Sequence, residues 1–153
     1  MDEFKSRAVQ SLVELHDKEL RAFVATWRRL VASGKPMPEA HGDPDYESPE
    51  RLVAHVQGAA RSYLLWIRLQ LEKPVEDLPL TRDPAVIVPR LDVFTEETLD
   101  GWRRHLAPLD DEQLAPRQYL SRWGEPHTIE QMLEHAVVHP MRHRIQLERI
   151  LAR

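Results

Sequence analysis

Cysteine is absent from the 153 residues of the chain. Disulfide bonds, thiolate metal sites and a cysteine nucleophile are therefore excluded, and any thiol chemistry needs a thiol from another molecule. Glycine is scarce as well, with 5 residues, which disfavours a β-sandwich or barrel built on tight turns. No apolar run approaches the length of a membrane span, and the acidic first residues are unlike a signal peptide. The sequence predicts a cytoplasmic protein that has no membrane partner.

A strong positive charge is also lacking, because the formal net charge at pH 7 is −4. A phosphate backbone is attracted by a basic field, so nucleic acid is not an expected partner and no nucleic-acid-binding residues are predicted. The short basic pairs Arg28-Arg29 and Arg103-Arg104 occur on predicted helices that also carry acids. We interpret these pairs as solvated helix faces.

The remaining composition is typical of a folded chain. Hydrophobic residues make up 42% and charged residues 30%, which favours a packed core over disorder. The length suits one ordinary domain, and neither an internal repeat nor a boundary interrupts the sequence. Residues 1–153 are therefore predicted to form a single helical domain.

Four segments carry the three- and four-residue apolar spacing of amphipathic helices. The first spans 3–33, and the second runs from Pro49 to about residue 72 behind the N-cap residue Ser48. Thr95, which two glutamates follow, is expected to open the third helix, ending near residue 107.

The last helix is predicted from residue 129 to near the C-terminus, behind a Thr128-x-x-Gln131 capping box. The proline-rich segments 34–48 and 74–94 are predicted loops. A loop as long as 74–94 is uncommon in a compact domain, and it either is a crossover or includes a short helical turn. The predicted fold class is all-α, a four-helix bundle with one long crossover between helices two and three.

Histidines at every fourth position mark the last predicted helix, namely His135, His139 and His143. Residues at i and i+4 of a helix lie one above the other, about 6 Å apart. Two imidazoles at that separation can converge on one metal ion, with bonds of about 2.0–2.1 Å. A stable site needs a third ligand, and His55 on the apolar stripe of the second helix is the best candidate. The sequence thus predicts one divalent ion held by His55, His139 and His143.

Other interpretations of these residues stay open. Each histidine could instead be a hydrogen-bonded core residue. His135 could replace His139 as a ligand or could orient a ligand, and Glu134 and His135 are the candidate general bases. His16 lies on the buried stripe of the first helix, where we expect a hydrogen-bonded core histidine or an orienting residue. Pro140 interrupts the helical amide bonds and either re-aims His139 or is simply tolerated.

The aromatic residues divide into two groups. Tyr63, Trp66 and Trp102 lie on helical stripes and are interpreted as core residues. Tyr119 and Trp123 belong to a predicted loop, which makes them the candidates for lining a pocket.

Two stretches resemble a known family. They are SPERLVAH at 48–55 and WGEPHTIEQMLEH at 123–135, which continues into VHPMRHRIQ at 138–146. Both resemble the DinB/YfiT-like superfamily of bacterial four-helix-bundle proteins. In that family a histidine near the start of helix two joins a His-x-x-x-His pair of the last helix to bind a metal. By position the resemblance implies His55, His139 and His143, although Ile145 stands where the family's His-Arg-Gly-Gln ending has glycine.

The resemblance also implies a chemistry. Members of this superfamily are often dimers, and their metal would be zinc, nickel or a similar ion. Some are S-transferases that use bacillithiol, mycothiol or another low-molecular-weight thiol. Three neutral ligands leave a position open on the ion, as in catalytic sites. The expected function is a metal-dependent transferase with a thiol cosubstrate and a small-molecule substrate. The alternatives are a metal-dependent hydrolase and a non-catalytic, stress-related bundle with a structural metal.

Overall fold

The computed structural model describes residues 3–114 and 116–153, and this part of the chain is mostly helical, as predicted. The long helices are α1 (Arg7–Ser33), α2 (Pro49–Gln70), α4 (Leu91–Leu106) and α6 (Ile129–Leu151). The short elements between them are η1 (Pro44–Tyr46), α3 (Pro84–Ile87), η2 (Val88–Arg90), α5 (Asp111–Leu114), β1 (Tyr119–Leu120) and β2 (Pro126–His127).

Side-chain caps set the first residues of the helices. Ser48 accepts a hydrogen bond from the amide of Arg51 at 3.1 Å, so the predicted start of α2 is confirmed. Both halves of the predicted capping box are formed at α6, between Thr128 and Gln131, at 3.1 and 2.9 Å. The first helix begins later than residue 3, because the hydroxyl of Ser6 caps it. Such caps typically stabilise a helix by about 1 kcal/mol.

The predicted start of the third helix is wrong. Helix α4 begins at Leu91, and Thr95 lies inside it. The side chains of Leu91 and Phe94 are buried, so core packing extends the helix by one turn beyond the expected cap. The hydroxyl of Thr95 donates to the carbonyl of Leu91 at 2.7 Å. It accepts from the side-chain amide of Gln57 on α2 at 2.8 Å.

All three predicted loops contain short regular elements, and the loop 34–48 contains η1. The segment 74–94 includes α3 and η2, which confirms the alternative of a short helical turn in this segment. The aromatic loop contains an antiparallel pair in which Tyr119 faces His127. The connecting turn includes Gly124 at a φ of 84°, a left-handed conformation that glycine adopts without strain.

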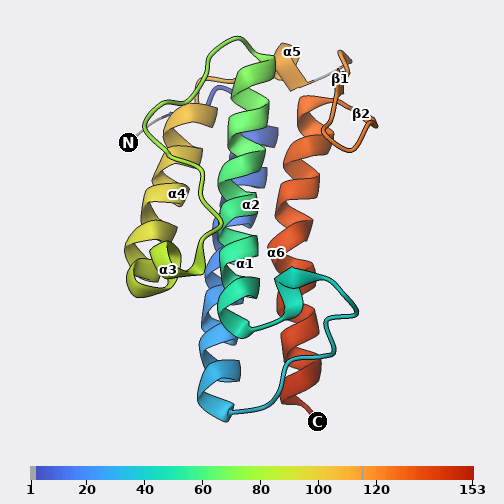
Figure 1. Cartoon of the computed structure of the whole chain (residues 1–153). Helices are drawn as coiled ribbons and strands as arrows, with labels where there is room; N and C mark the ends of the chain where they lie inside the picture. Colours follow the sequence, from blue (N-terminus) through green and yellow to red (C-terminus); the bar gives the residue numbers. More distant parts are fainter. Residues whose placement is uncertain (1–2, 115) are drawn as a thin grey trace.

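The four long helices pack around a shared core. Helix α1 packs against α6 and α4, and α2 packs against the same two helices. Helices α2 and α4 run in the same direction, and the chain between them returns along the molecule before α4 begins (Figure 1). None of the helices in the two described ranges combines the length and the apolar character that a membrane crossing requires.

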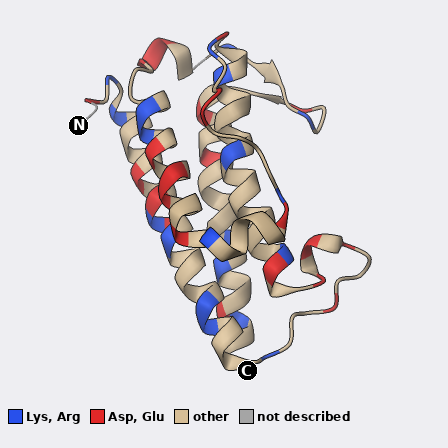
Figure 2. Ribbon diagram, turned by 60° about the vertical axis from the view of Figure 1, so that its left-hand side comes forward, with Lys and Arg blue, Asp and Glu red and all other residues tan. Residues whose placement is uncertain are grey.

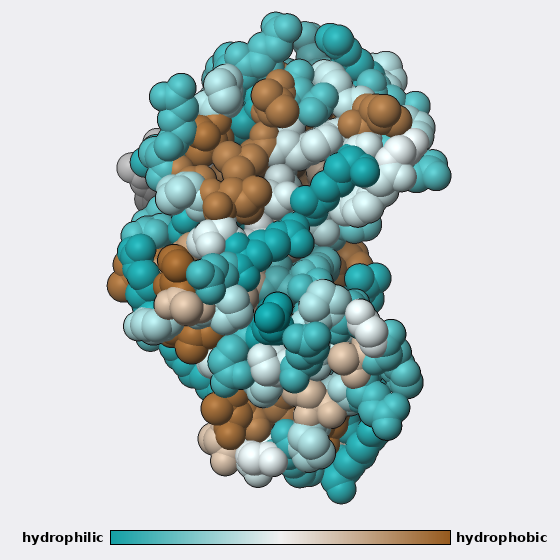
Figure 3. All heavy atoms as spheres, viewed as in Figure 1, coloured by the Kyte–Doolittle hydropathy of each residue, from teal (hydrophilic) through white to brown (hydrophobic). Residues whose placement is uncertain are grey.

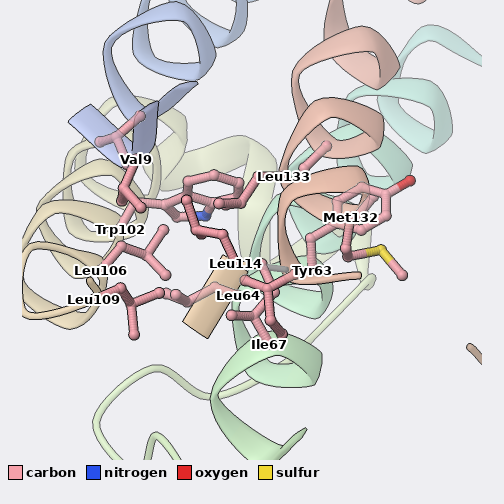
Figure 4. Packing of buried hydrophobic residues seen from close by; sticks show 14 of the residues in the cluster. Val9, Tyr63, Leu64, Ile67, Trp102, Leu106, Leu109, Leu114, Met132 and Leu133 are labelled. Atoms are coloured by element: carbon pink, nitrogen blue, oxygen red, sulfur yellow. The ribbon is translucent and has the colours of Figure 1, made fainter. Parts of the chain in front are cut away.

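The core has two apolar clusters, one toward each end of the helices. Figure 4 shows the first, where Trp102 and Leu106 of α4 meet Leu64 of α2 and Leu133 of α6. The second lies farther along the helices and includes Phe23 of α1. Burying a large apolar side chain contributes about 1.5–3 kcal/mol. These clusters therefore fix α2 and α6 side by side on either side of the turns that carry the predicted metal ligands.

A buried arginine ties the 71–83 segment to the helices. Arg61 of α2 is 1% exposed, and its guanidinium donates to the carbonyl of Pro79 at 2.9 Å and to the hydroxyl of Thr98 at 2.9 Å. It also pairs with Glu97 at 3.1 Å and lies 3.5 Å from the ring centre of Phe94. Because a buried charge is costly without partners, these contacts hold the 71–83 segment against α2 and α4.

The outer faces of the helices carry charges of both signs (Figure 2). Arg28 pairs with Asp92 at 2.7 Å, and Arg103 pairs with Asp100 at 3.2 Å. These exposed pairs agree with the interpretation of the basic dipeptides as solvated faces. Exposed pairs of this kind contribute at most about 1 kcal/mol each.

Candidate metal centre

The three predicted ligands come together between the two apolar clusters. His55 projects from α2, and His139 and His143 project from successive turns of α6. One ring nitrogen from each histidine lies within 4.8 Å of the others. The Nε2 atoms of His55 and His139 are 3.0 Å apart. The three histidines are therefore close enough to bind one metal ion.

Two of the rings have a polar side chain beside their Nδ1 atom. Nδ1 of His143 lies 2.9 Å from Oε1 of Gln146. Nδ1 of His55 lies 2.9 Å from Oδ2 of Asp45, an ion-pair distance without hydrogen-bond alignment. A partner on one ring nitrogen determines the ring orientation and leaves the other nitrogen for a metal.

The donor set fits a divalent ion. Nε2 of His143 is buried and has no hydrogen-bond partner among the described residues. An unsatisfied buried polar atom costs about 1–3 kcal/mol, a cost that a coordinated cation removes. Ligand atoms around a tetrahedral zinc ion stand about 3.3 Å apart, given bonds of about 2.0–2.1 Å. The three nitrogens lie within 4.8 Å of one another, and those of His55 and His139 are 3.0 Å apart, so their separations are comparable to that spacing.

Burial keeps the histidines in the form that binds metal. Desolvation, joined by the neighbouring histidines, lowers the pKa of His139 to about 2 and that of His143 to about 4. Desolvation also lowers the pKa of His55, although the carboxylate of Asp45 opposes the shift. Only a neutral imidazole can bind a metal, so at pH 7 these rings need not lose a proton.

A cavity of about 620 Å³ opens beside the three histidines. Its walls include Asp43 and Tyr46 of the loop around η1, and Tyr63 of α2. Figure 3 shows the outline of the molecule hollowed between the β1–β2 hairpin and that loop. The volume suits a small molecule, since ligand pockets typically measure about 300–1,000 Å³.

Two of the other predicted site residues line this cavity. The rings of His135 and Trp123 stack with centroids 4.9 Å apart and an interplanar angle of 28°. Tyr63, which the sequence placed only in the core, lies between His135 and His139, with ring centroids 5.6 and 5.8 Å away. Desolvation by burial lowers the pKa of His135, so this ring is also neutral at pH 7.

Glu134 and Tyr119 lie elsewhere. Glu134 is exposed on α6 and does not border the cavity. Tyr119 packs edge-on against Trp66, with ring centroids 6.2 Å apart, and does not border the cavity either. Of the two candidate bases, only His135 reaches the cavity wall.

His16 and Pro140 also receive definite positions. His16 is fully buried, as expected, but the predicted hydrogen bond is wrong: neither ring nitrogen has a partner among the described residues. The ring instead stacks on Trp102, with centroids 3.7 Å apart and planes 6° apart. Pro140 is buried inside α6, which continues through it to Leu151.

Several cavity residues are absent from the sequence prediction. They include Asp45 and the arginines Arg82, Arg122 and Arg142. Gln146, which does not border the cavity but lies 2.9 Å from Nδ1 of His143, is absent from the prediction as well. Gln146 follows a predicted ligand by three residues, a spacing that places both on one helix face. The other four carry no comparable signal, because Arg82 and Arg122 lie on irregular segments, Asp45 lies in the short element η1, and Arg142 resembles any exposed helix arginine.

Comparison with protein-family models, with curated proteins and with solved structures finds no match. The resemblance noted in the sequence therefore stays a prediction.

Proposed function

We propose that the protein is a metal-dependent transferase of the DinB/YfiT-like superfamily that uses a low-molecular-weight thiol as cosubstrate. The observation that supports this function best is the meeting of His55, His139 and His143 beside a cavity of about 620 Å³. Neutral nitrogen ligands next to space for a small molecule are typical of catalytic rather than closed structural sites.

The proposed architecture is a four-helix bundle with one crossover. Each of α1, α2, α4 and α6 packs against at least two of the others. The parallel course of α2 and α4 requires a connection that returns along the bundle (Figure 1). Such a bundle places ligands from facing helices around one ion.

Zinc or nickel is the proposed ion. Imidazole ligands suit zinc, nickel, copper and iron, whereas oxygen ligands suit magnesium and calcium. A divalent ion in this centre would lower the pKa of a thiol that reaches it and so supply a nucleophile near neutral pH. The thiol comes from a cosubstrate because the chain has no cysteine.

Side chains of the chain itself orient the histidine ligands and line the cavity. Gln146 orients the ring of His143, and the carboxylate of Asp45 lies beside Nδ1 of His55. Trp123 provides an aromatic wall for the bound molecule.

Thiol-dependent turnover tests this function. The zinc-loaded protein is mixed with an electrophilic aryl chloride and a thiol such as cysteine, bacillithiol or mycothiol. Sulfur displaces chloride on the ring, and the thiol proton passes to solvent. We expect a rate above the uncatalysed reaction that is lost in His143→Ala and kept in His16→Leu. An equal rate without thiol, or in both variants, contradicts the proposal. A metal that raises the melting temperature without any activity favours the structural-metal alternative.

Hydrolysis is the second candidate, because His135 borders the cavity with a lowered pKa and can accept a proton. On an ester substrate and without thiol, His135→Gln should lower the hydrolysis rate. Glu134→Gln serves as the matched control, since Glu134 lies outside the cavity. Equal rates in both variants contradict a base role for His135.

A further inference from the structure

Three arginines border the cavity beside the candidate metal centre, and none of them has an acidic partner among the described residues. Arg82, Arg122 and Arg142 all border the cavity, and none lies within ion-pair distance of a carboxylate among the described residues. Exposed arginines elsewhere, such as Arg29 and Arg149, also lack such a partner among the described residues, so the distinguishing feature is that three unpaired arginines border one cavity. Unpaired guanidinium groups around one hollow repel each other, so their clustering favours an anionic ligand.

Arg82 reaches the cavity because α2 has a glycine beneath it. A Cβ atom on Gly58 would lie 2.5 Å from Cγ of Arg82 and 2.8 Å from the carbonyl oxygen of Thr81. Any other residue at position 58 would push the backbone at Thr81 and Arg82 away from α2. The segment is also fixed by the hydrogen bond between Arg61 and Pro79. Arg82 is therefore carried on an anchored stretch of chain.

Arg122 approaches from the β1–β2 hairpin. Its Nη1 donates to the hydroxyl of Ser62 on α2 at 2.7 Å, and its guanidinium lies 5.3 Å from the ring centre of Trp123. A guanidinium has five N–H donors, so this contact orients the group and leaves donors for a ligand. Burial, and after it the charge of Arg82, lowers the pKa of Arg122.

The acids of the cavity are engaged elsewhere. Asp45 lies against the ring of His55. The carboxylate of Asp43 accepts the backbone amide of Asp45 at 3.0 Å. Both belong to the loop around η1, whereas Arg82 and Arg122 come from the crossover and the hairpin. The cavity thus keeps a basic part that its own carboxylates do not neutralise.

We propose that the cavity binds its substrate or cosubstrate through an anionic oxygen group, a carboxylate or a phosphate, seated between Arg82 and Arg122. The planar donor fork of arginine matches both groups, and an anion there removes the repulsion between the two guanidinium groups. Arg142, beside His143 on α6, adds to the attraction. The anionic group would belong to the substrate or cosubstrate of the proposed transferase, so its part in a reaction rests on the proposed function. The contact between the anion and the arginines needs no metal.

Calorimetric titration at low ionic strength tests the proposal. The probes are succinate, inorganic phosphate and the neutral analogue succinamide. The zinc-loaded proteins are the wild type, Arg82→Gln/Arg122→Gln, and the charge-matched control Arg7→Gln/Arg29→Gln on the exposed face of α1. We expect succinate or phosphate to bind the wild type and the control alike, and to bind the Arg82/Arg122 variant at least about tenfold more weakly. The stronger of the two anions identifies the group.

Three results would overturn the proposal: no binding of either anion to the wild type, equal binding of succinamide, or an equal loss in the control. A fourth arm uses His143→Ala, which removes a metal ligand and keeps the arginines. Anion binding that is retained in His143→Ala supports a binding position between Arg82 and Arg122. Its loss there assigns the anion to the metal instead and contradicts the proposal. Zinc content measured on each sample separates this result from failure of the metal centre.

Discussion

Two buried histidine environments lie in the same set of helices. His16 is enclosed between α1 and α4, and burial lowers its pKa to about 3. His139 and His143 are buried on α6, and burial again lowers their pKa values, to about 2 and about 4. All three rings are neutral at pH 7. Burial and charge state therefore do not distinguish them.

The surroundings do distinguish the two environments. His16 lies flat on Trp102, whose indole nitrogen donates to the carbonyl of Ala60 at 2.9 Å, and it does not border the cavity. The nitrogens of His139 and His143 converge with that of His55 beside open space. An inward histidine is thus a core residue by default, and convergence on a cavity is what indicates chemistry.

Removing a proposed ligand should have the largest effect. His143→Ala deletes one of three donors, so we expect zinc affinity to fall more than about 100-fold, beyond the 10–100-fold typical of residues that only orient ligands. Competition with a chromophoric chelator measures the change. His16→Leu is the matched control, with an equally buried histidine removed and zinc affinity retained. Similar losses in the two variants would mean that the centre depends on general packing.

Zinc binding should also stabilise the fold. A ligand that binds only the native state, at 100 times its dissociation constant, adds about 2.7 kcal/mol to the free energy of unfolding. We expect this gain in the wild type and in His16→Leu, and no gain in His143→Ala. Urea unfolding with and without zinc gives the measurement. A gain of the same size in His143→Ala would point to binding elsewhere on the chain.

Loss of a ring-holding residue should have a smaller effect. Gln146→Leu removes the oxygen that lies 2.9 Å from Nδ1 of His143, and we expect zinc affinity to fall about tenfold. Glu148→Gln, on the same helix, is the control, because Glu148 pairs with Arg144 instead. Chelator competition again supplies the affinities. Unchanged affinity in Gln146→Leu would show that the ring needs no external partner.

The smallest expected effect concerns the pH dependence of His16. An unfolded histidine titrates near pH 6.5 and the buried ring near pH 3, so below pH 6.5 the unfolded chain binds one more proton. Stability must therefore fall as pH falls through this window, by about 1 kcal/mol between pH 6.5 and 5.5. In a His139→Ala/His143→Ala background without metal, His16→Leu should remove this part of the slope. Parallel stability curves would mean that His16 is protonated in the fold.

Much of the fold could be predicted from the sequence. The caps at Ser48 and Thr128 and the apolar periodicity depend on neighbours in the chain, so local patterns are sufficient for them. Thr95 misled the prediction because tertiary packing of Leu91 and Phe94 extends α4 past the local cap signal.

The candidate site also has one part that the sequence predicts and another part that it does not. His139 and His143 share a helix face by their spacing, and the stripe of α2 identified His55. Arg82 and Arg122 lie on segments with no periodicity, and only the 71–83 segment and the hairpin bring them to the cavity. Their convergence is a property of the tertiary structure that no local pattern shows.

Elemental analysis of the protein without a histidine tag, beside His139→Ala/His143→Ala, is the decisive measurement. We expect about one equivalent of zinc or nickel in the wild type and none in the double variant, because a three-histidine site loses two of its ligands. A wild type that holds no metal after reloading with zinc and with nickel, or a double variant that holds as much, would contradict a metal centre at His55, His139 and His143.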